Sequence, residues 1–275
     1  MCGILGIVTP DLSAATPPDP APSHSPHLAQ FQRALDTLAR RGPDDQGVYD
    51  EPGVTLGQRR LAILDLSHEG HQPMTSADGR FVIVFNGEVY NFEELRKDLD
   101  RAGVKLRSRS DTEVILELYA REGTRCVDRF RGMFALAIWD KRERELFLLR
   151  DRLGIKPLYY TLQGGTLAFA SELKALRALG AAPGGIAPQA LRDFLLWGSV
   201  PSPEGFVEGV RSLAPGTWAR FKGDALRCET YWDIPRDGVQ YRTRAQALEA
   251  LRPALEESVA LRCIADVPVG AFLSG

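Results

Sequence analysis

The sequence predicts an α+β fold in which the helices are segregated from the β-sheets. Segments rich in β-branched, aromatic or apolar residues come in groups along the chain, and segments with helical spacing separate these groups. A doubly wound parallel sheet would instead place a helix after nearly every strand. The grouping therefore favours sheets with segregated helices.

The N-terminal part of the chain predicts a strand, a surface loop and a helix. The opening residues 1–8 are apolar and strand-like, and residues 10–26 hold six prolines, a composition that does not pair or pack as regular structure. The helix is indicated by apolar residues at helical spacing, at Leu28, Phe31, Leu35 and Leu38. Gly42-Pro43 ends this helix.

The central part of the chain predicts strands and two helices. The strand candidates span residues 57–64, 81–85, 133–139, 146–150, 158–161 and 167–170. One helix is expected to begin at Asn91, a good N-cap with Glu94 three residues later, and to end near Gly103. The other is expected from Thr112 to Glu122, with an apolar stripe that predicts burial of one face.

The C-terminal part predicts one more group of elements. They are a helix over 188–197, a hairpin over 217–231 that turns at Lys222-Gly223-Asp224, and a polar linker over 233–241. Apolar residues from 247 to 261 indicate a long helix, in which Pro253 marks a kink or a second start. Residues 266–275 are expected to form a strand leading into a Gly-rich turn.

Composition argues against several classes of function. Lys and Arg total 34 against 36 Asp and Glu, so a net charge of −2 offers no general attraction to nucleic acid or to an acidic membrane. The apolar runs are far shorter than the about 20 residues that span a bilayer, and the N-terminus lacks a secretory signal, so a cytoplasmic protein is expected. The four cysteines and four histidines show no metal-ligand spacing, so no metal site is expected.

Cys2 is the first residue with catalytic potential. If Met1 is removed, Cys2 carries both a thiol and a free α-amine, whose ordinary pKa values of roughly 8.5 and 7.7–8.0 lie close to neutral pH. A nucleophile and its base then occupy one residue. On this dipeptide alone, a small buried apolar cysteine is the simpler interpretation.

Four more motifs follow in a set order. They are Arg41-Gly42-Pro43-Asp44, Gln58-Arg59-Arg60-Leu61-Ala62-Ile63, Phe85-Asn86-Gly87-Glu88-Val89-Tyr90-Asn91 and Ser110-Asp111-Thr112-Glu113. Together with Met1-Cys2-Gly3-Ile4, the set resembles class II glutamine amidotransferases, the N-terminal-nucleophile glutaminases. The resemblance implies a four-layer αββα sandwich.

The resemblance also implies catalytic roles for Cys2, Asn86 and Gly87. Cys2 would attack the side-chain amide of glutamine. The Asn86 side chain and the Gly87 N–H would form an oxyanion hole, a task worth about 2.7–4 kcal/mol per donor. An Asn-Gly pair in isolation is typical of an ordinary turn. Glu88 would touch the substrate ammonium or lie on the surface.

L-Glutamine is the substrate that this resemblance implies. Arg60 would bind its α-carboxylate bidentately. Asp111 would pair with its α-ammonium, although an Asp before a helix also suits an N-cap. Arg41 would support the Cys2 thiolate or order its own loop, or lie on the surface. The implied glutamine-binding residues are Arg60, Leu61, Ala62, Ile63, Leu64, Asn86, Gly87, Glu88 and Asp111.

Later stretches resemble asparagine synthetases. Residues 149–159, 169–176, 210–216 and 231–232 look like the rest of the glutaminase domain in that family. The expected organisation is a glutaminase domain over 1–232, a linker over 233–241 and the start of an ATP-binding synthetase domain over 242–275.

The last residues resemble the opening of the α/β, ATP-pyrophosphatase-like synthetase domain. There, a strand leads into a Ser-Gly-Gly loop that cradles the pyrophosphate of ATP, and Leu273, Ser274 and Gly275 correspond to its beginning. Because the sequence stops at that point, we expect this chain by itself to be unable to adenylate aspartate.

The resulting hypothesis is hydrolysis of glutamine to glutamate and ammonia through a Cys2 thioester. This would be the amide-donor half of a glutamine-dependent asparagine synthase. The glutaminase step needs no cofactor, whereas ATP and Mg²⁺ would serve a complete synthetase. A synthetase chain in trans or a homodimer partner is expected, with neither nucleic acid nor membrane. The alternatives are a non-catalytic glutamine- or partner-binding fragment and another class II amidotransferase.

Overall fold

Two antiparallel β-sheets form the centre of the fold. The computed structural model describes residues 1–10, 26–238 and 241–272. Within these residues, the first sheet has the strand order β10-β8-β9-β1-β3-β2, and the second has the order β12-β11-β7-β6-β5-β4. The strands are β1 (Gly3–Val8), β2 (Asp45–Glu51), β3 (Val54–Arg60), β4 (Met74–Thr75), β5 (Phe81–Val89), β6 (Gly132–Asp140), β7 (Glu145–Arg150), β8 (Tyr159–Gln163), β9 (Thr166–Ala170), β10 (Arg211–Ser212), β11 (Thr217–Lys222) and β12 (Ala225–Thr230).

The side chains of the two sheets divide into three apolar cores. Because successive strand residues point to opposite faces, Ile4 packs between the sheets while Leu5 points to the outer face of the first sheet. In the same way, Val84 packs between the sheets and Phe85 points to the outer face of the second sheet. The sheets therefore pack face to face and need helices on both outer faces.

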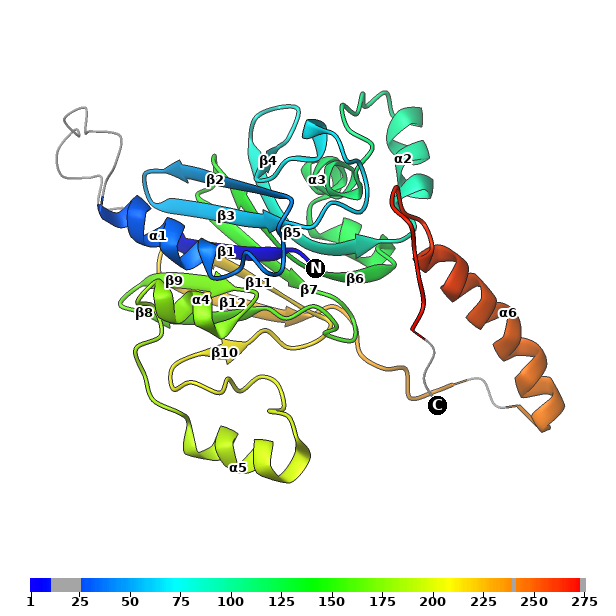
Figure 1. Ribbon diagram of the computed structural model, residues 1–275. Helices are drawn as coiled ribbons and strands as arrows, with labels where there is room; N and C mark the ends of the chain where they lie inside the picture. Colours follow the sequence, from blue (N-terminus) through cyan, green and yellow to red (C-terminus); the bar gives the residue numbers. More distant parts are fainter. Residues whose placement is uncertain (11–25, 239–240, 273–275) are drawn as a thin grey trace.

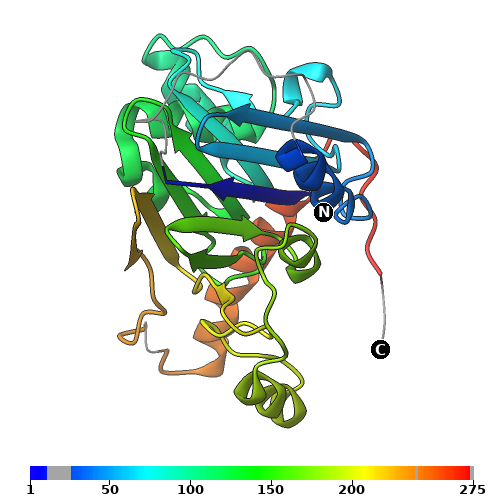
Figure 2. The same ribbon diagram turned by 90° about the vertical axis from the view of Figure 1, so that its left-hand side faces the viewer.

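Helices cover both outer faces. Helices α1 (Pro26–Asp36) and α4 (Leu173–Ala178) pack on the first sheet, and α2 (Phe92–Arg101) and α3 (Asp111–Glu122) pack on the second. This arrangement confirms the predicted α+β class and the four-layer αββα sandwich (Figures 1 and 2).

The remaining helices are short or lie away from the sandwich. Two 3₁₀ turns, η1 (His68–Gly70) and η2 (Gly123–Arg129), connect elements. In Figure 1, α5 (Pro188–Trp197) lies below the sheets and α6 (Arg244–Arg262) extends from their right-hand side. Pro253 lies inside α6, and the helix continues through it. The predicted Pro-rich loop falls almost entirely on residues 11–25, outside the described part.

Three sequence predictions need correction. The strand predicted over 57–64 is β3, which ends at Arg60. Strand β5 runs on to Val89, so Asn86 and Gly87 pair with β6 and do not form a turn. The strand predicted from residue 266 is absent from the described residues 266–272, where no neighbouring strand supplies hydrogen bonds.

The N-cap expected at Asn91 also behaves differently. Asn91 precedes α2, but its side chain makes no capping bond. Its Nδ2 instead donates to the Arg129 carbonyl at 3.0 Å, and its Oδ1 accepts from the Arg131 N–H at 2.9 Å. The Asn91 amide thus ties the start of α2 to the segment that leads into β6.

Candidate active site

One cavity gathers residues from both sheets and from α3. Its lining includes Cys2 just before β1, Arg60 at the end of β3, Asn86 within β5 and Asp111 at the start of α3. Other lining residues are Met1, Leu61, Ile63, Leu64, Gln72, Phe85, Gly87, Glu88, Ser110, Thr112, Met133 and Lys156. Most of the candidate residues, which are up to 109 positions apart in the sequence, therefore meet at one place.

Cys2 presents its thiol at this cavity. Its Sγ lies 3.4 Å from the backbone nitrogen of Leu61, which donates to it, and 3.6 Å from the Leu61 carbonyl. Burial raises the pKa of the Cys2 thiol, whereas the Leu61 backbone, the terminal amine and Arg60 act in the opposite direction. Met1 is present, so the Cys2 nitrogen is a peptide amide in this structure.

The side-chain amide of Asn86 is buried and makes no hydrogen bond within the described residues. It is fully buried, and neither its Nδ2 nor its Oδ1 has a hydrogen-bond partner among the described residues. An unpaired buried amide costs about 1–3 kcal/mol. Because the residue also lines the cavity, this amide is available to a ligand there.

The backbone of β5 points the Gly87 N–H in the direction of the same cavity. The Phe85 N–H donates to Gln72 Oε1 at 2.7 Å, and the Val89 N–H donates to Asp111 Oδ2 at 2.9 Å. Alternate residues of a strand direct their N–H groups to the same side. The Gly87 N–H therefore points to the same side as those of Phe85 and Val89, between Gln72 and Asp111. Phe134 lies opposite Gly87 on β6 but does not accept the Gly87 N–H. Its own N–H donates to Asp151 Oδ2, and its carbonyl accepts the Asp151 N–H.

Gly87 also leaves no room for a side chain. A Cβ at this position would lie 2.3 Å from the Met133 carbonyl oxygen and 2.6 Å from the Phe134 Cα. Glycine is therefore required here by the close approach of β6 to β5.

Asp111 is a buried carboxyl group at the first position of α3. Burial, aided by the negative charge of Glu88, raises its pKa to about 7, although the Val89 N–H that it accepts acts to lower it. The helix cap is Ser110, whose side chain accepts the Glu113 N–H, so the N-cap interpretation of Asp111 is wrong. Burial likewise raises the pKa of Glu88.

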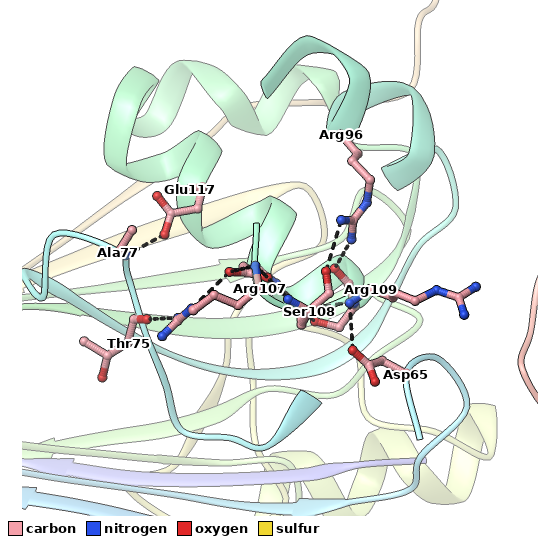
Figure 3. A network of polar contacts seen from close by, with 10 residues as sticks. Asp65, Thr75, Ala77, Arg96, Arg107, Ser108, Arg109 and Glu117 are labelled. Carbon is pink, nitrogen blue, oxygen red and sulfur yellow. Dashed lines mark hydrogen bonds and ion pairs between the residues drawn. The ribbon is translucent and has the colours of Figure 1, made fainter. Parts of the chain in front are cut away.

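The segment before α3 is held by several polar contacts that place Asp111. The Arg96 guanidinium donates to the Ser108 carbonyl at 3.0 Å, and Arg107 Nη2 donates to the Thr75 carbonyl at 2.8 Å (Figure 3). The Arg109 N–H donates to Asp65 Oδ2 at 2.7 Å in the same network. The backbone immediately before Asp111 is thus held by hydrogen bonds with α2 and with the loops at Asp65 and Thr75.

Arg60 lies in the cavity wall and also braces the loop that follows it. Its Nη2 donates to the carbonyls of Leu64 at 3.0 Å and Asp65 at 2.6 Å. Leu61, Ile63 and Leu64 line the cavity, but Ala62 is not among the lining residues, and its N–H donates to Asp44 Oδ2 at 2.9 Å.

Arg41 forms hydrogen bonds with the Cys2 backbone and with Glu172, and not with the Cys2 thiol. Its Nε donates to the Cys2 carbonyl at 2.8 Å, and its Nη1 pairs with Glu172 at 3.1 Å. It therefore joins its own loop to the backbone of Cys2 and to Glu172, whereas no bond to the thiolate is found within the described residues and the side chain is not a free surface group. Leu273, Ser274 and Gly275 lie outside the described residues.

Lys156 is a cavity residue to which the sequence alone assigned no role. It is 5 % exposed, and burial lowers the pKa of its ammonium while Glu88 and Cys2 oppose that change. Its loop is organised by the Asp151 carboxylate, which accepts the N–H groups of Phe134, Leu153, Ile155 and Lys156. The signal in the sequence was the stretch 149–159, which resembles the glutaminase domain of asparagine synthetases and contains Lys156.

Among the described residues, no group of His, Cys, Asp and Glu is arranged to hold a metal ion. The same residues contain no helix with the length and apolarity that a bilayer crossing requires.

The αββα sandwich and the cavity around Cys2 agree with the resemblance to glutamine amidotransferases. The chain belongs to the glutamine amidotransferase domain family, whose model matches residues 1–232. A model described as asparagine synthase matches residues 250–275.

Two proteins of similar sequence agree with both family matches. The chain is 36% identical over 248 residues to asparagine synthetase [glutamine-hydrolyzing] 3 of Bacillus subtilis, covering 89% of this chain and 40% of that protein. It is 38% identical over 292 residues to a putative asparagine synthetase [glutamine-hydrolyzing] of Mycobacterium bovis, covering 100% of this chain and 44% of that protein. The chain thus spans less than half the length of these relatives.

A solved structure shows the same fold. The glutamine phosphoribosylpyrophosphate amidotransferase of Bacillus subtilis, complexed with ADP and GMP, matches with a TM-score of 0.61 and 18% identity, covering 85% of this chain and 50% of that one.

Proposed function

We propose that this chain hydrolyses L-glutamine to glutamate and ammonia through a thioester on Cys2. The unpaired, buried amide of Asn86 beside the Cys2 thiol is the observation that carries the proposal. A buried polar group without a hydrogen-bond partner destabilises the folded protein, and a ligand oxygen that accepts its hydrogen bond removes this destabilisation. Beside a nucleophile, such a donor suits the oxyanion that forms when the thiol attacks an amide carbon.

Each step of the proposed reaction has a group in the cavity. Cys2 Sγ attacks the side-chain amide carbon, and the oxyanion accepts hydrogen bonds from Asn86 Nδ2 and the Gly87 N–H. The α-amine of Cys2 takes the thiol proton and returns it to the leaving nitrogen, so that ammonia departs. Water then cleaves the thioester. This route requires loss of Met1, because only then is the amine free.

The two ends of glutamine have partners of opposite charge in the proposal. Asp111, with Glu88 beside it, binds the α-ammonium, and Arg60 binds the α-carboxylate. Leu61, Ile63 and Leu64 cover the apolar part of the side chain.

The matched relatives extend the proposal to the fate of the ammonia. Both are named asparagine synthetases, so we propose that the ammonia serves asparagine synthesis from aspartate. The glutaminase step uses no cofactor, and ATP with Mg²⁺ belongs to the synthetase reaction. The proposed organisation is a glutaminase domain over 1–232 followed by a linker and synthetase residues.

Ammonia release from glutamine by the purified chain tests the glutaminase proposal. Intact mass first shows whether Met1 has been lost. We expect ammonia from the des-Met protein and a loss of at least about 1,000-fold in Cys2→Ala, since the nucleophile is gone. Cys228→Ala, at an exposed cysteine, is the matched control and retains full activity. Glutamine binding without turnover by folded des-Met protein would support a non-catalytic fragment instead.

A further inference from the structure

The segment after α6 returns to the wall of the cavity. Helix α6 is attached through an ion pair of 2.9 Å between Arg131 and Glu257. The Arg262 guanidinium lies 4.8 Å from the centre of the Tyr90 ring. Ile264 then packs against the apolar core beneath α2 and α3. These contacts bring the next residues beside the loop that follows β3.

Two hydrogen bonds join Asp266 to that loop, residues 61–65. The Asp266 N–H donates to the Ile63 carbonyl at 2.9 Å. The Asp65 N–H donates to Asp266 Oδ2 at 2.8 Å. Together these bonds bracket Leu64, and both Ile63 and Leu64 line the cavity of Cys2.

The same loop is braced from within the sandwich at Asp65. The Asp65 carboxylate accepts the Arg109 N–H at 2.7 Å, as Figure 3 shows, and the Ser67 N–H at 3.1 Å. Arg60 holds the Asp65 carbonyl. The Asp65 N–H donates to Asp266, so the loop is bonded to a residue outside the matched amidotransferase domain.

We propose that Asp266 is a positioning residue for the 61–65 loop, through which the segment matched by the asparagine synthase model sets the affinity for glutamine. The inference rests on the proposed glutaminase function, because it takes this cavity as the glutamine site. A hydrogen bond to a charged carboxylate is stronger than one between neutral groups, but one-third of the Asp266 side chain is exposed, which weakens it. The expected effect on glutamine affinity is therefore about three- to tenfold.

Two substitutions at Asp266 separate the side-chain acceptor from the rest of the residue. Asp266→Ala removes the acceptor for the Asp65 N–H, whereas Asp266→Asn keeps an oxygen at the same place. Asp237→Ala, at an exposed residue before α6, is the control for loss of one negative charge. All variants are made in the full 275-residue chain.

Hydrogen exchange of the peptide that contains residues 61–67 is measured first, without glutamine. We expect faster exchange in Asp266→Ala, and exchange at the wild-type rate in Asp266→Asn and Asp237→Ala. Unchanged exchange in Asp266→Ala, or equal acceleration in Asp266→Asn, would overturn the proposal. This readout needs no turnover, so an inactive wild-type chain would refute the proposed function and leave the positioning result standing.

Steady-state kinetics then test the consequence for glutamine. In Asp266→Ala we expect KM to rise about three- to tenfold while kcat stays within about twofold, because Asp266 bonds to the loop at Ile63 and Asp65 and contacts neither Cys2 nor the proposed oxyanion donors. Asp266→Asn should restore KM. A fall in kcat with constant KM, in a variant that melts at the wild-type temperature, would contradict a positioning role in glutamine binding.

Discussion

Asp111 is the residue whose chemistry the fold changes most clearly. A carboxyl group in water has a pKa of about 3.9, but burial beside Glu88 raises that of Asp111 to about 7. Its ionised form is the one that pairs with an ammonium group, so a bound α-ammonium would stabilise the charge that burial opposes. The carboxyl is thus suited to respond to the ligand.

The pH dependence of KM for glutamine follows from this raised pKa. The raised pKa favours the protonated form of Asp111 below about pH 7 in the unliganded protein, and in the proposed binding mode glutamine must then expel that proton. KM should therefore rise as pH falls from 8 to 5.5, approaching tenfold per pH unit at the acid end. Initial rates at varied glutamine and pH measure this. Asp111→Asn should have a high KM at every pH, and a flat wild-type KM would contradict the assignment.

Lys156 supplies a positive charge to the same cavity. The charge of Lys156 contributes to lowering the pKa of the Met1 amine, and we expect it to act in the same direction on the α-amine of Cys2 once Met1 is lost. Lys156→Met should shift the acid limb of the kcat/KM profile to higher pH by about half a unit. Lys156→Arg retains the charge and serves as the matched control. An unshifted limb in Lys156→Met would show that its charge does not reach the amine.

At the scale of elements, the close contact of β5 with β6 places the proposed oxyanion donors, Asn86 and Gly87. Gly87→Ala would put a methyl group 2.3 Å from the Met133 carbonyl oxygen, and the strands must separate to admit it. We expect kcat to fall at least about 100-fold and the free energy of unfolding to fall by about 1–3 kcal/mol. Gly185→Ala, where an added Cβ meets nothing within 4 Å, should leave both unchanged. Wild-type activity in Gly87→Ala would refute the role of this strand.

The pattern of apolar residues in the sequence located most of the β-strands. It missed strand β2 and misplaced the end of β3. The segments that became β6, β7 and β9 are almost continuously apolar and buried, so their patterns were clear. Strand β2 was missed because Asp45–Glu51 is largely polar and its residues are at most partly buried at the edge of the first sheet. Strand β3 ended earlier than expected, since the residues after Arg60 line the cavity.

For the whole molecule, removal of residues 242–275 separates folding from glutamine affinity. The three apolar cores lie within residues 1–232, apart from the partial contact of Ile264. The truncated chain should therefore unfold cooperatively. It also lacks the exposed apolar side chains of α6, which are Leu248, Leu251, Leu255 and Val259. Its KM should rise as in Asp266→Ala. Denaturant unfolding and glutaminase kinetics measure both, and loss of cooperative unfolding would show that α6 is part of the domain.

The sequence by itself determined the fold class, the nucleophile candidate and the order of the motifs around it. Periodicity and composition are local properties, and the spaced motifs of Cys2, Arg60, Asn86 and Asp111 carried the family resemblance. Only the tertiary structure decided how these residues act together. The unpaired Asn86 amide, the raised pKa of Asp111 and the link from Asp266 to the 61–65 loop depend on burial and contacts between distant segments. Such contacts leave no local pattern in the chain, because each partner alone is an ordinary polar residue.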